Sequence, residues 1–329
     1  MAAIQRVGIA GTGSYIPKRK IPNSYFEDIV DTSNEWIIQR TGIEQRFFVD
    51  EGETTSSMCI EAGKHALEAA GLKGEDLDMI IVGTLTPDHL LPSCSARVQL
   101  GLGATNAGAF DCNAACTGFM TAMSIGEAFI RAGRARRIMV LGAESLSRFI
   151  NFNDRGSCIL FGDGAGAAIL TPWEDCKQGE ILETSLGADG SGYEHIYMQG
   201  GGSEHPPTAE TVAEKIHFIT VKGREVYRFA VNKMTGLINE MLEGHDRSEL
   251  GMIVPHQVNL RIIESALEKL EIPMEQCFVN IQKYGNTSAA TIPIALDEAV
   301  RQGCLEKDKL VLMAAFGAGL TWGSVKVRW

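Results

Sequence analysis

The chain has 329 residues, of which 45% are hydrophobic and 7% aromatic, a composition typical of a soluble globular protein. Its 30 basic and 41 acidic residues give a formal net charge of -11, which argues against nucleic acid as the main partner. A phosphate-bearing ligand must therefore meet a local basic patch. The length allows a large core and two domains or two halves of one domain.

The beginning of the chain, "MAAIQRVGIAGTG", lacks the charged start, long apolar region and cleavage site of a secretory signal. The charge-free run "LVLMAAFGAGLTWGSV" is shorter than the roughly 20 apolar residues that cross a bilayer. These features predict a cytoplasmic protein that does not enter a membrane. In that reducing compartment most of the eight cysteines are expected to be small buried hydrophobic residues.

The first segments along the chain, "RVGIAGTG", "CIEAGKHALEAAGL" and "LDMIIVGTL", alternate short apolar runs with an amphipathic stretch. The alternation continues through "RRIMVLGAES" and "GAGAAILTP", and a similar series begins after the polar stretch "PWEDCKQGE". Strands that alternate with helices predict an α/β protein whose sheets are covered by helices.

The chain also resembles itself, which suggests a duplication. "EDLDMIIVG" matches "SELGMIVPH" with Gly83 over His256, and "CTGFMTAMSIGEAFIRAG" overlays "NTSAATIPIALDEAVRQG" with Cys116 over Asn286. The two offsets, 173 and 170, differ by three residues. We therefore expect two similar halves, residues 1–180 and 181–329, packed around a pseudo-twofold axis. Equivalent helices would begin at Cys116 and Asn286 and face each other.

The segment after Cys116 is apolar or small except for one narrow polar stripe, which predicts a helix buried nearly all round. The stripe consists of Thr117, Thr121, Ser124, Glu127 and Arg131. The partner segment contains Pro293, and proline fits only the first turn of a helix. That helix is expected to begin a few residues after Asn286 or to be kinked.

Cys116 is a candidate nucleophile because of its place at the start of this helix. Unpaired backbone N–H groups and the helix dipole favour negative charge there, so we expect the pKa of its thiol to be lowered. The same N–H groups could form an oxyanion hole. Cys112 and Cys116 are spaced too widely for a CxxC knuckle, and no second pair follows at zinc spacing, so no metal is expected. Packing remains the alternative for Cys116, and Cys112 is expected only to pack.

Two further residues strengthen the case for catalysis. His256 directly follows the apolar strand "GMIV", at a strand end where α/β sites are commonly built, although a lone histidine can also be structural. Asn286 is a good N-cap, and its NH₂ group could also donate to an oxyanion. The glycine-rich turn in "AAFGAGLTWGSV" could bring backbone close to both.

Together, "DCNAACTGF", "PHQVNLRI", "YGNTSAA" and "FGAGLTWGS" closely resemble the β-ketoacyl-acyl-carrier-protein synthase III family, which primes bacterial fatty acid synthesis. The resemblance runs from "GTGSYIP" to the final "VRW". It implies the thiolase fold, an α/β architecture with five layers in the order α-β-α-β-α and two pseudo-symmetric halves. It also implies an acyltransferase that condenses a short acyl-CoA with malonyl-acyl-carrier protein, without a bound cofactor, and a homodimer.

The resemblance assigns roles residue by residue. Cys116 would carry the acyl group, with its own N–H and that of Ala318 holding the thioester oxygen. His256 and Asn286 would bind the malonyl thioester carbonyl while CO₂ leaves, and His256 must be neutral to donate there. The resemblance also implies three sets of binding residues: Trp36, Arg40, Thr41, Arg155, Gly223, Tyr227 and Asn259 for CoA; Leu90, Leu91 and Phe316 for the acyl pocket; and Arg261, Arg228 and Lys269 for carrier-protein docking.

The sequence departs from the family pattern in two places. Ala318 stands in the middle of a triplet that is usually all glycine, and Leu90 and Leu91 stand where an aromatic residue is sometimes found. The starter unit therefore remains open. A starter-unit condensing enzyme of a polyketide or signalling pathway is one alternative. A thioester hydrolase in which His256 acts as a base directly on Cys116 is another.

Overall fold

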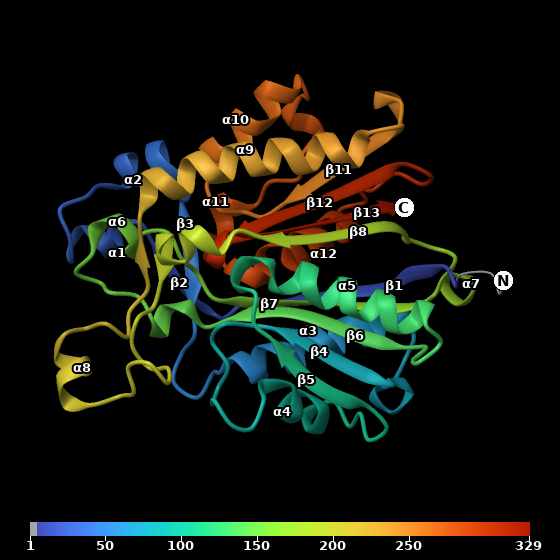
Figure 1. The fold of residues 1–329 in the computed structure, drawn as a ribbon, viewed down its shortest axis with the longest axis horizontal. Helices are drawn as coiled ribbons and strands as arrows, with labels where there is room; N and C mark the ends of the chain where they lie inside the picture. The colour runs from blue at the N-terminus through green and yellow to red at the C-terminus, as the bar shows by residue number, and fades with distance from the viewer. Residues whose placement is uncertain (1–4) are drawn as a thin grey trace.

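The computed structural model describes residues 5–329; residues 1–4, at the expected start of the first half, lie outside the described part. One sheet with the strand order β11-β12-β13-β8-β1-β7-β6-β4-β5 runs through the molecule (Figure 1). The order is nearly symmetric about the junction of β8 and β1, which pair at Val7 and Ile181. Two similar half-sheets thus meet edge to edge.

In the first half-sheet the apolar strands β6, β4 and β5 pair in parallel, and the buried strands β6 and β4 are of the kind expected where both faces are covered. Its strands are β1 (Val7–Tyr15), β4 (Met79–Gly83), β5 (Gly108–Cys112), β6 (Ile138–Glu144) and β7 (Gly164–Pro172). Its helices are α3 (Thr55–Ala70), α4 (Cys94–Gly101) and α5 (Gly118–Arg131).

The second half repeats this plan without a full counterpart of β5, which is reduced to a bridge between Ile253 and Cys277. Its strands are β8 (Glu180–Ala188), β11 (Leu250–Pro255), β12 (Leu310–Gly317) and β13 (Thr321–Arg328). Its helices are α9 (Gly223–Leu242), α10 (Leu260–Leu270) and α12 (Thr291–Arg301).

Smaller elements surround the two half-sheets and carry much of the cavity wall described below. The hairpin strands are β2 (Arg19–Pro22), β3 (Gln45–Phe48), β9 (Ile196–Tyr197) and β10 (Thr220–Val221). The short helices are α1 (Ser24–Glu27), α2 (Asn34–Thr41), α6 (Arg155–Cys158), α7 (Trp173–Cys176), α8 (Ala209–Ala213) and α11 (Ile281–Tyr284).

The helices and half-sheets form five layers. Helices α3 and α4 cover the outer face of the first half-sheet, and α9 with α10 covers the second (Figure 1). Between the half-sheets lie α5 and α12, whose Phe119, Met123 and Leu296 share one buried cluster with strand residues of both halves. The predicted thiolase-like α/β fold is confirmed in this arrangement.

The buried helix α5 has the polar stripe that the sequence predicts, and the stripe faces β8. Ser124 and Glu127 lie 3.2 Å from the Thr184 hydroxyl, and Arg131 pairs with Glu127 and with the Ile181 carbonyl. The narrow polar stripe is therefore satisfied inside the protein rather than by solvent. Pro293 lies in the first turn of α12, so the predicted late start of that helix is correct.

The predicted alignment of Cys116 with Asn286 is wrong by three residues. Both buried helices are preceded by a 3₁₀ turn, η2 (Ala115–Thr117) and η7 (Ser288–Ala290), and these turns are 173 residues apart. Cys116 is therefore equivalent to Ala289. The offset of 170 holds only at the helix ends, because α5 has 14 residues and α12 has 11. The sequence alignment matched the C-terminal ends of the two helices and applied the same offset of 170 to their starts, where the correct offset is 173.

The starts of the two buried helices pack at backbone contact distance. A Cβ added at Gly142 of β6 would lie 2.1 Å from the Ala289 carbonyl oxygen, and one added at Gly118 would lie 3.2 Å from the Ala289 Cβ. Only glycine fits the first of these positions. Within residues 5–329 no helix combines the length and apolar character that crossing a membrane requires.

The contact at Gly142 leads to a stability prediction. Gly142→Ala should lower the free energy of unfolding by at least about 1 to 3 kcal/mol, because the new methyl group meets rigid backbone. The matched control is Gly236→Ala in α9, where an added Cβ meets nothing within 4 Å, so stability should stay level or rise slightly. Chemical denaturation measures both, and equal stability of the two variants would contradict the proposed contact.

Candidate active site

Four residues from distant parts of the chain surround one cavity. Cys116 lies in η2, His256 directly follows β11, Asn286 lies between α11 and η7, and Ala318 begins the turn η8 (Ala318–Leu320) after β12. All four line a cavity of about 380 Å³. The convergence of these residues, which the sequence motifs suggest, is thus present in the fold.

The pKa of the Cys116 thiol differs from the prediction made from the sequence. Burial raises its pKa to about 11, and the nearby Glu144 carboxylate acts in the same direction. Hydrogen bonds from the Ser288 hydroxyl and from the backbone of Cys116 and Ala318 lower the pKa, but by less. The predicted lowering is therefore wrong for the free protein. The N-terminal N–H groups are present, yet loss of solvation outweighs them.

The backbone around the sulfur suits an oxyanion hole. The backbone N–H groups of Cys116 and Ala318 lie near enough to the thiol to lower its pKa. A Cβ at Gly317 would lie 2.9 Å from the Cys116 Cβ, so glycine is needed for this approach. The left-handed positions of the turn fall on Gly319 and Leu320, not on Ala318. Alanine at position 318 therefore leaves the N–H in place without backbone strain.

His256 is buried and neutral. Burial lowers its pKa to about 3, so the imidazole is uncharged at physiological pH, as its expected role as a donor requires. Nδ1 lies 2.7 Å from the Thr291 hydroxyl, while Nε2 has no hydrogen-bond partner within residues 5–329. The ring packs edge-on against Phe316, with centroids 5.6 Å apart. Nε2 is thus the nitrogen available to a substrate. Because the Thr291 hydroxyl donates to the Ser288 carbonyl at 2.9 Å, Nδ1 carries the ring proton here, and Nε2 can donate once that hydroxyl turns to donate to Nδ1.

Asn286 is oriented by its own turn. Its Oδ1 accepts the Ser288 N–H at 2.9 Å, which leaves the NH₂ group as the end that can donate into the cavity. The equivalent residue in the first half, Asn113, accepts the Ala115 N–H at 3.3 Å. The capping role and the donor role therefore coexist in one side chain.

A cationic and aromatic cluster lies at one end of the cavity. The guanidinium carbon of Arg155 lies 4.3 Å from the Trp36 ring centroid, and that of Arg40 lies 5.7 Å from it. Trp36 and Arg40 line the cavity, whereas Arg155 contacts it through Trp36 and through its neighbour Gly156. The structure thus brings together three of the residues expected to bind CoA.

The other residues expected to bind CoA also line the cavity, but several already have partners. Thr41 donates to the Ile37 carbonyl, and Tyr227 lies 3.0 Å from the Ser265 hydroxyl. Asn259 caps α10 and donates to the Arg40 carbonyl at 3.1 Å, so it also joins α10 to α2. Gly223 contributes backbone only, at the start of α9.

Two of the three residues expected in the acyl pocket do not line the cavity of this chain. Phe316 does, but Leu90 and Leu91 are 89% and 87% exposed. They lie on the loop after β4, which turns outward. The sequence matches Leu90 and Leu91 to a segment that lines the acyl pocket in the family, but it does not indicate the direction in which the loop points. The expected docking residues Arg261, Arg228 and Lys269 are all exposed on α10 and α9.

Similar proteins identify the family. Family models of 3-oxoacyl-[acyl-carrier-protein (ACP)] synthase III match residues 110–190, and those of its C-terminal part match residues 242–329. The chain belongs to this family. A β-ketoacyl-[acyl-carrier-protein] synthase III from Caldanaerobacter subterraneus is 48% identical over 324 residues, which cover 98% of this chain and 97% of that one. The predicted acyltransferase and condensing-enzyme identity is thereby confirmed.

Solved structures agree with the sequence comparison. The 3-oxoacyl-[acyl-carrier-protein] synthase III from Aquifex aeolicus VF5 is 45% identical with a TM-score of 0.90, covering 98% of this chain and 100% of that one. The priming β-ketosynthase of the R1128 polyketide pathway is 34% identical with a TM-score of 0.91, covering 100% and 98%. The fold is therefore shared by family members of more than one pathway.

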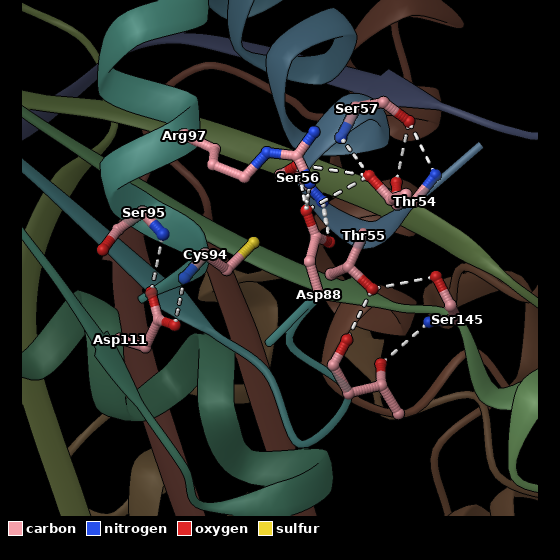
Figure 2. A network of polar contacts seen from close by, with 11 residues as sticks. Thr54, Thr55, Ser56, Ser57, Asp88, Cys94, Ser95, Arg97, Asp111 and Ser145 are labelled. Atoms are coloured by element: carbon pink, nitrogen blue, oxygen red, sulfur yellow. Dashed lines mark hydrogen bonds and ion pairs between the residues drawn. The ribbon is translucent and has the colours of Figure 1, made fainter. Parts of the chain in front are cut away.

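A polar network fixes the loop that separates this family member's cavity from its exposed leucines (Figure 2). Asp88 accepts the Ser56 N–H at 2.9 Å and pairs with Arg97 at 2.5 Å. Thr55 donates to the Thr86 carbonyl at 2.6 Å and lies 2.8 Å from the Ser145 hydroxyl. The start of α3 thus holds the first part of the loop, at Thr86 and Asp88, beside Ser145 at the end of β6.

Sequence reasoning missed Glu144 and Ser288. Glu144 ends the fully buried strand β6, and Ser288 lines the cavity beside Cys116. A signal existed for the first, because a carboxylate directly after the run "IMVLGA" must be buried or lie at a site. The serine in "NTSAA" has no such signal. No group of three or more metal-ligating side chains occurs in the described part of the chain.

The raised thiol pKa leads to a labelling prediction. Iodoacetamide should alkylate Cys116 in the free protein about 100-fold more slowly at pH 8 than it alkylates an unstructured cysteine peptide, because two pKa units remove that share of thiolate. The rate should still be rising at pH 10. Peptide mass spectrometry with fragmentation separates Cys116 from Cys112, and Cys116→Ala removes the signal. Labelling at neutral pH as fast as the peptide would contradict the raised pKa.

Proposed function

We propose that this chain performs the family's condensation in two steps on Cys116. An acyl-CoA first transfers its acyl group to the sulfur. Malonyl-acyl-carrier protein then loses CO₂, and the resulting carbanion attacks the acyl group to give 3-oxoacyl-acyl-carrier protein. The observation that carries this proposal is the convergence of a thiol, an unpartnered imidazole nitrogen, an amide NH₂ and two backbone N–H groups on one cavity.

The two sets of donors would serve two different oxygens. The N–H groups of Cys116 and Ala318 lie beside the sulfur, near where the oxygen of an acyl-cysteine would develop charge. The Asn286 NH₂ group is a neutral donor suited to the enolate oxygen formed when CO₂ leaves. Neutral His256 would join it in the tautomer that carries the ring proton on Nε2, with the Thr291 hydroxyl donating to Nδ1. Neither set needs a metal or a bound cofactor.

The cavity supports entry of CoA from the end marked by Trp36, Arg155 and Arg40. An indole with two guanidinium groups nearby suits the stacking of an adenine ring, and the cations suit the phosphates. The walls toward Cys116 are mostly apolar, as the pantetheine arm requires. These walls include Ile159, Ile196, Ile219, Val221, Val226 and Ile262.

The carrier protein would dock on α10 and α9 beside the same entrance. Arg261 follows Asn259, which lines the cavity, and Arg228 follows Tyr227. Glu264 and Glu268 on the same helix weaken the positive charge of this surface. We also propose a homodimer, division of the chain near residue 180 and a cytoplasmic location.

Two alternatives remain from the sequence. A starter role in a polyketide pathway is supported by the likeness to the R1128 priming β-ketosynthase. The acyl group that the enzyme accepts would distinguish this role from a role in fatty acid synthesis. A thioester hydrolase would need His256 as a strong base. The lowered pKa of His256, about 3, disfavours that role.

The two steps can be separated by variants. Wild-type protein incubated with a panel of acyl-CoAs should gain one acyl mass, and Cys116→Ser should gain none. Asn286→Ala should still acylate, but decarboxylation of malonyl-acyl-carrier protein should fall on the order of 100- to 1000-fold, because one oxyanion donor is lost. Intact-mass spectrometry and CO₂ release measure the two steps. Absence of any wild-type adduct, or normal condensation by Asn286→Ala, would count against the proposal.

The two substrates should depend on different surface residues. Trp36→Ala should raise KM for acyl-CoA roughly 10-fold, because the stacking surface is lost, and leave KM for malonyl-acyl-carrier protein nearly unchanged. Arg261→Glu should raise KM for malonyl-acyl-carrier protein about 10-fold and leave KM for acyl-CoA nearly unchanged, and the rise should depend on salt. Steady-state kinetics at two ionic strengths measure both. A parallel rise of both constants in either variant would contradict the assignment.

A further inference from the structure

The proposed chemistry leaves one proton without a destination. The thiol of Cys116 must lose its proton as it attacks a thioester, yet burial holds its pKa near 11. His256 is a poor acceptor, because its pKa is lowered to about 3. A third buried titratable group, Glu144, lies behind the thiol and has no part in the steps above.

Glu144 is fully buried at the end of β6 and is surrounded by neutral donors. One oxygen, Oε2, accepts from the Thr84 hydroxyl at 3.2 Å, the Leu85 N–H at 3.2 Å, and the Thr86 N–H and hydroxyl at 3.1 and 2.6 Å. Within residues 5–329 the other, Oε1, receives only the shared Leu85 N–H and the Ser288 hydroxyl, both at 3.3 Å. Oε1 is therefore the oxygen with room for a proton.

The directions of these hydrogen bonds are fixed. The Thr86 hydroxyl accepts the Ser145 N–H at 2.8 Å, so its own proton points to Glu144. The Thr84 hydroxyl likewise accepts the Thr86 N–H at 3.0 Å. Ser288 is different, because its hydroxyl donates to the Glu144 carboxylate at 3.3 Å, and Ser288 also lines the cavity with Cys116, near enough to lower the pKa of the thiol. The Ser288 hydroxyl can therefore change the direction in which it donates, between Cys116 and Glu144.

We infer that Ser288 relays the proton of the Cys116 thiol to Oε1 of Glu144 during acyl transfer. As the sulfur attacks the thioester carbonyl, the S–H bond breaks and its proton binds Ser288 Oγ. The original Ser288 proton passes to Glu144, so the carboxylate becomes a carboxylic acid. When the CoA thiolate leaves, the same path returns a proton to it, and Glu144 is ionised again. This inference rests on the proposed acylation of Cys116.

The surroundings of Glu144 suit a group that exchanges a proton near neutral pH. Burial raises its pKa to about 7, and the neutral donors only partly offset that rise. The other titratable groups near it are Cys116 on η2, His256 across the cavity, and Asp163, which precedes the Gly164 that pairs with Glu144. Asp163 is bonded to Ser147 and Val49 instead, and burial raises its pKa to about 6 although these hydrogen bonds and Arg148 oppose the rise. The loop after β4 contributes only uncharged groups to Glu144, from Thr84, Leu85 and Thr86.

Two variants interrupt the relay. Glu144→Gln removes the proton acceptor, and Ser288→Ala removes the link. The backbone accepts alanine at position 288, because the equivalent residue in the first half is Ala115, with φ of 46° against 50° for Ser288. The matched control is Asp163→Asn, which removes a second buried carboxyl with a raised pKa, about 6, that does not touch Ser288.

The experiment measures acylation of Cys116 by acetyl-CoA, or by the CoA ester that wild type prefers, with rapid quench and intact-mass spectrometry from pH 5.5 to 9.5. The wild-type rate should rise through pH 7 as Glu144 ionises and then level off. Both relay variants should be about 100-fold slower at pH 7.5 and should lack that rise. The double variant should be no slower than either single one. Asp163→Asn should keep the wild-type profile.

Several results would overturn the relay. Unchanged or faster acylation in Glu144→Gln would show that the carboxylate only opposes the thiolate by its charge. An equal fall of acylation and of malonyl decarboxylation, or an equal fall in Asp163→Asn, would show a structural role. If Glu144→Gln does not fold, Ser288→Ala decides alone. If wild type forms no adduct with any acyl-CoA, the proposed function fails instead of the relay.

Discussion

The close approach of two helix starts is the constraint on which the rest of this structure depends. The turns η2 and η7 meet between the half-sheets, and glycines at positions 118, 142 and 317 let backbone touch backbone there. This contact places Cys116 beside Ser288 and under the Ala318 N–H. It also removes the thiol from water, which raises its pKa. The geometry that assembles the site therefore also makes its nucleophile difficult to ionise.

Burial acts in opposite directions on the acids and the base of this site. It raises the pKa values of Cys116 and Glu144 and lowers that of His256, because each shift favours the neutral form. A neutral imidazole is what a hydrogen-bond donor to an enolate needs. A neutral thiol is not what a nucleophile needs, so the two half-reactions place different demands on one dry cavity. Neutral donors can stabilise the enolate, and Glu144 can accept the proton of the thiol. The cavity then needs no fixed positive charge for either half-reaction.

Much of this could be predicted from the sequence, and the errors have physical causes. The α/β pattern, the duplication and the convergence of Cys116, His256 and Asn286 follow from apolar periodicity and motifs. The register was wrong because α12 lost three residues within the helix, where no sequence signal marks the place. The predicted lowering of the thiol pKa is wrong because a helix terminus can be recognised in the sequence, whereas its exposure to solvent cannot. The outward orientation of Leu90 and Leu91 depends on tertiary contacts of a loop.

The corrected register changes how the two halves should be compared. Asn113, Ala115 and Cys116 are equivalent to Asn286, Ser288 and Ala289, so each half has the same asparagine-capped turn with a left-handed third residue. The first half fills the fourth position of the turn with the nucleophile. The second keeps that position small and puts a hydroxyl at the third. Because the turns face each other, a change at any of these positions alters the surroundings of the other half. The chemistry thus arises from differences between two copies of one backbone motif rather than from either copy alone.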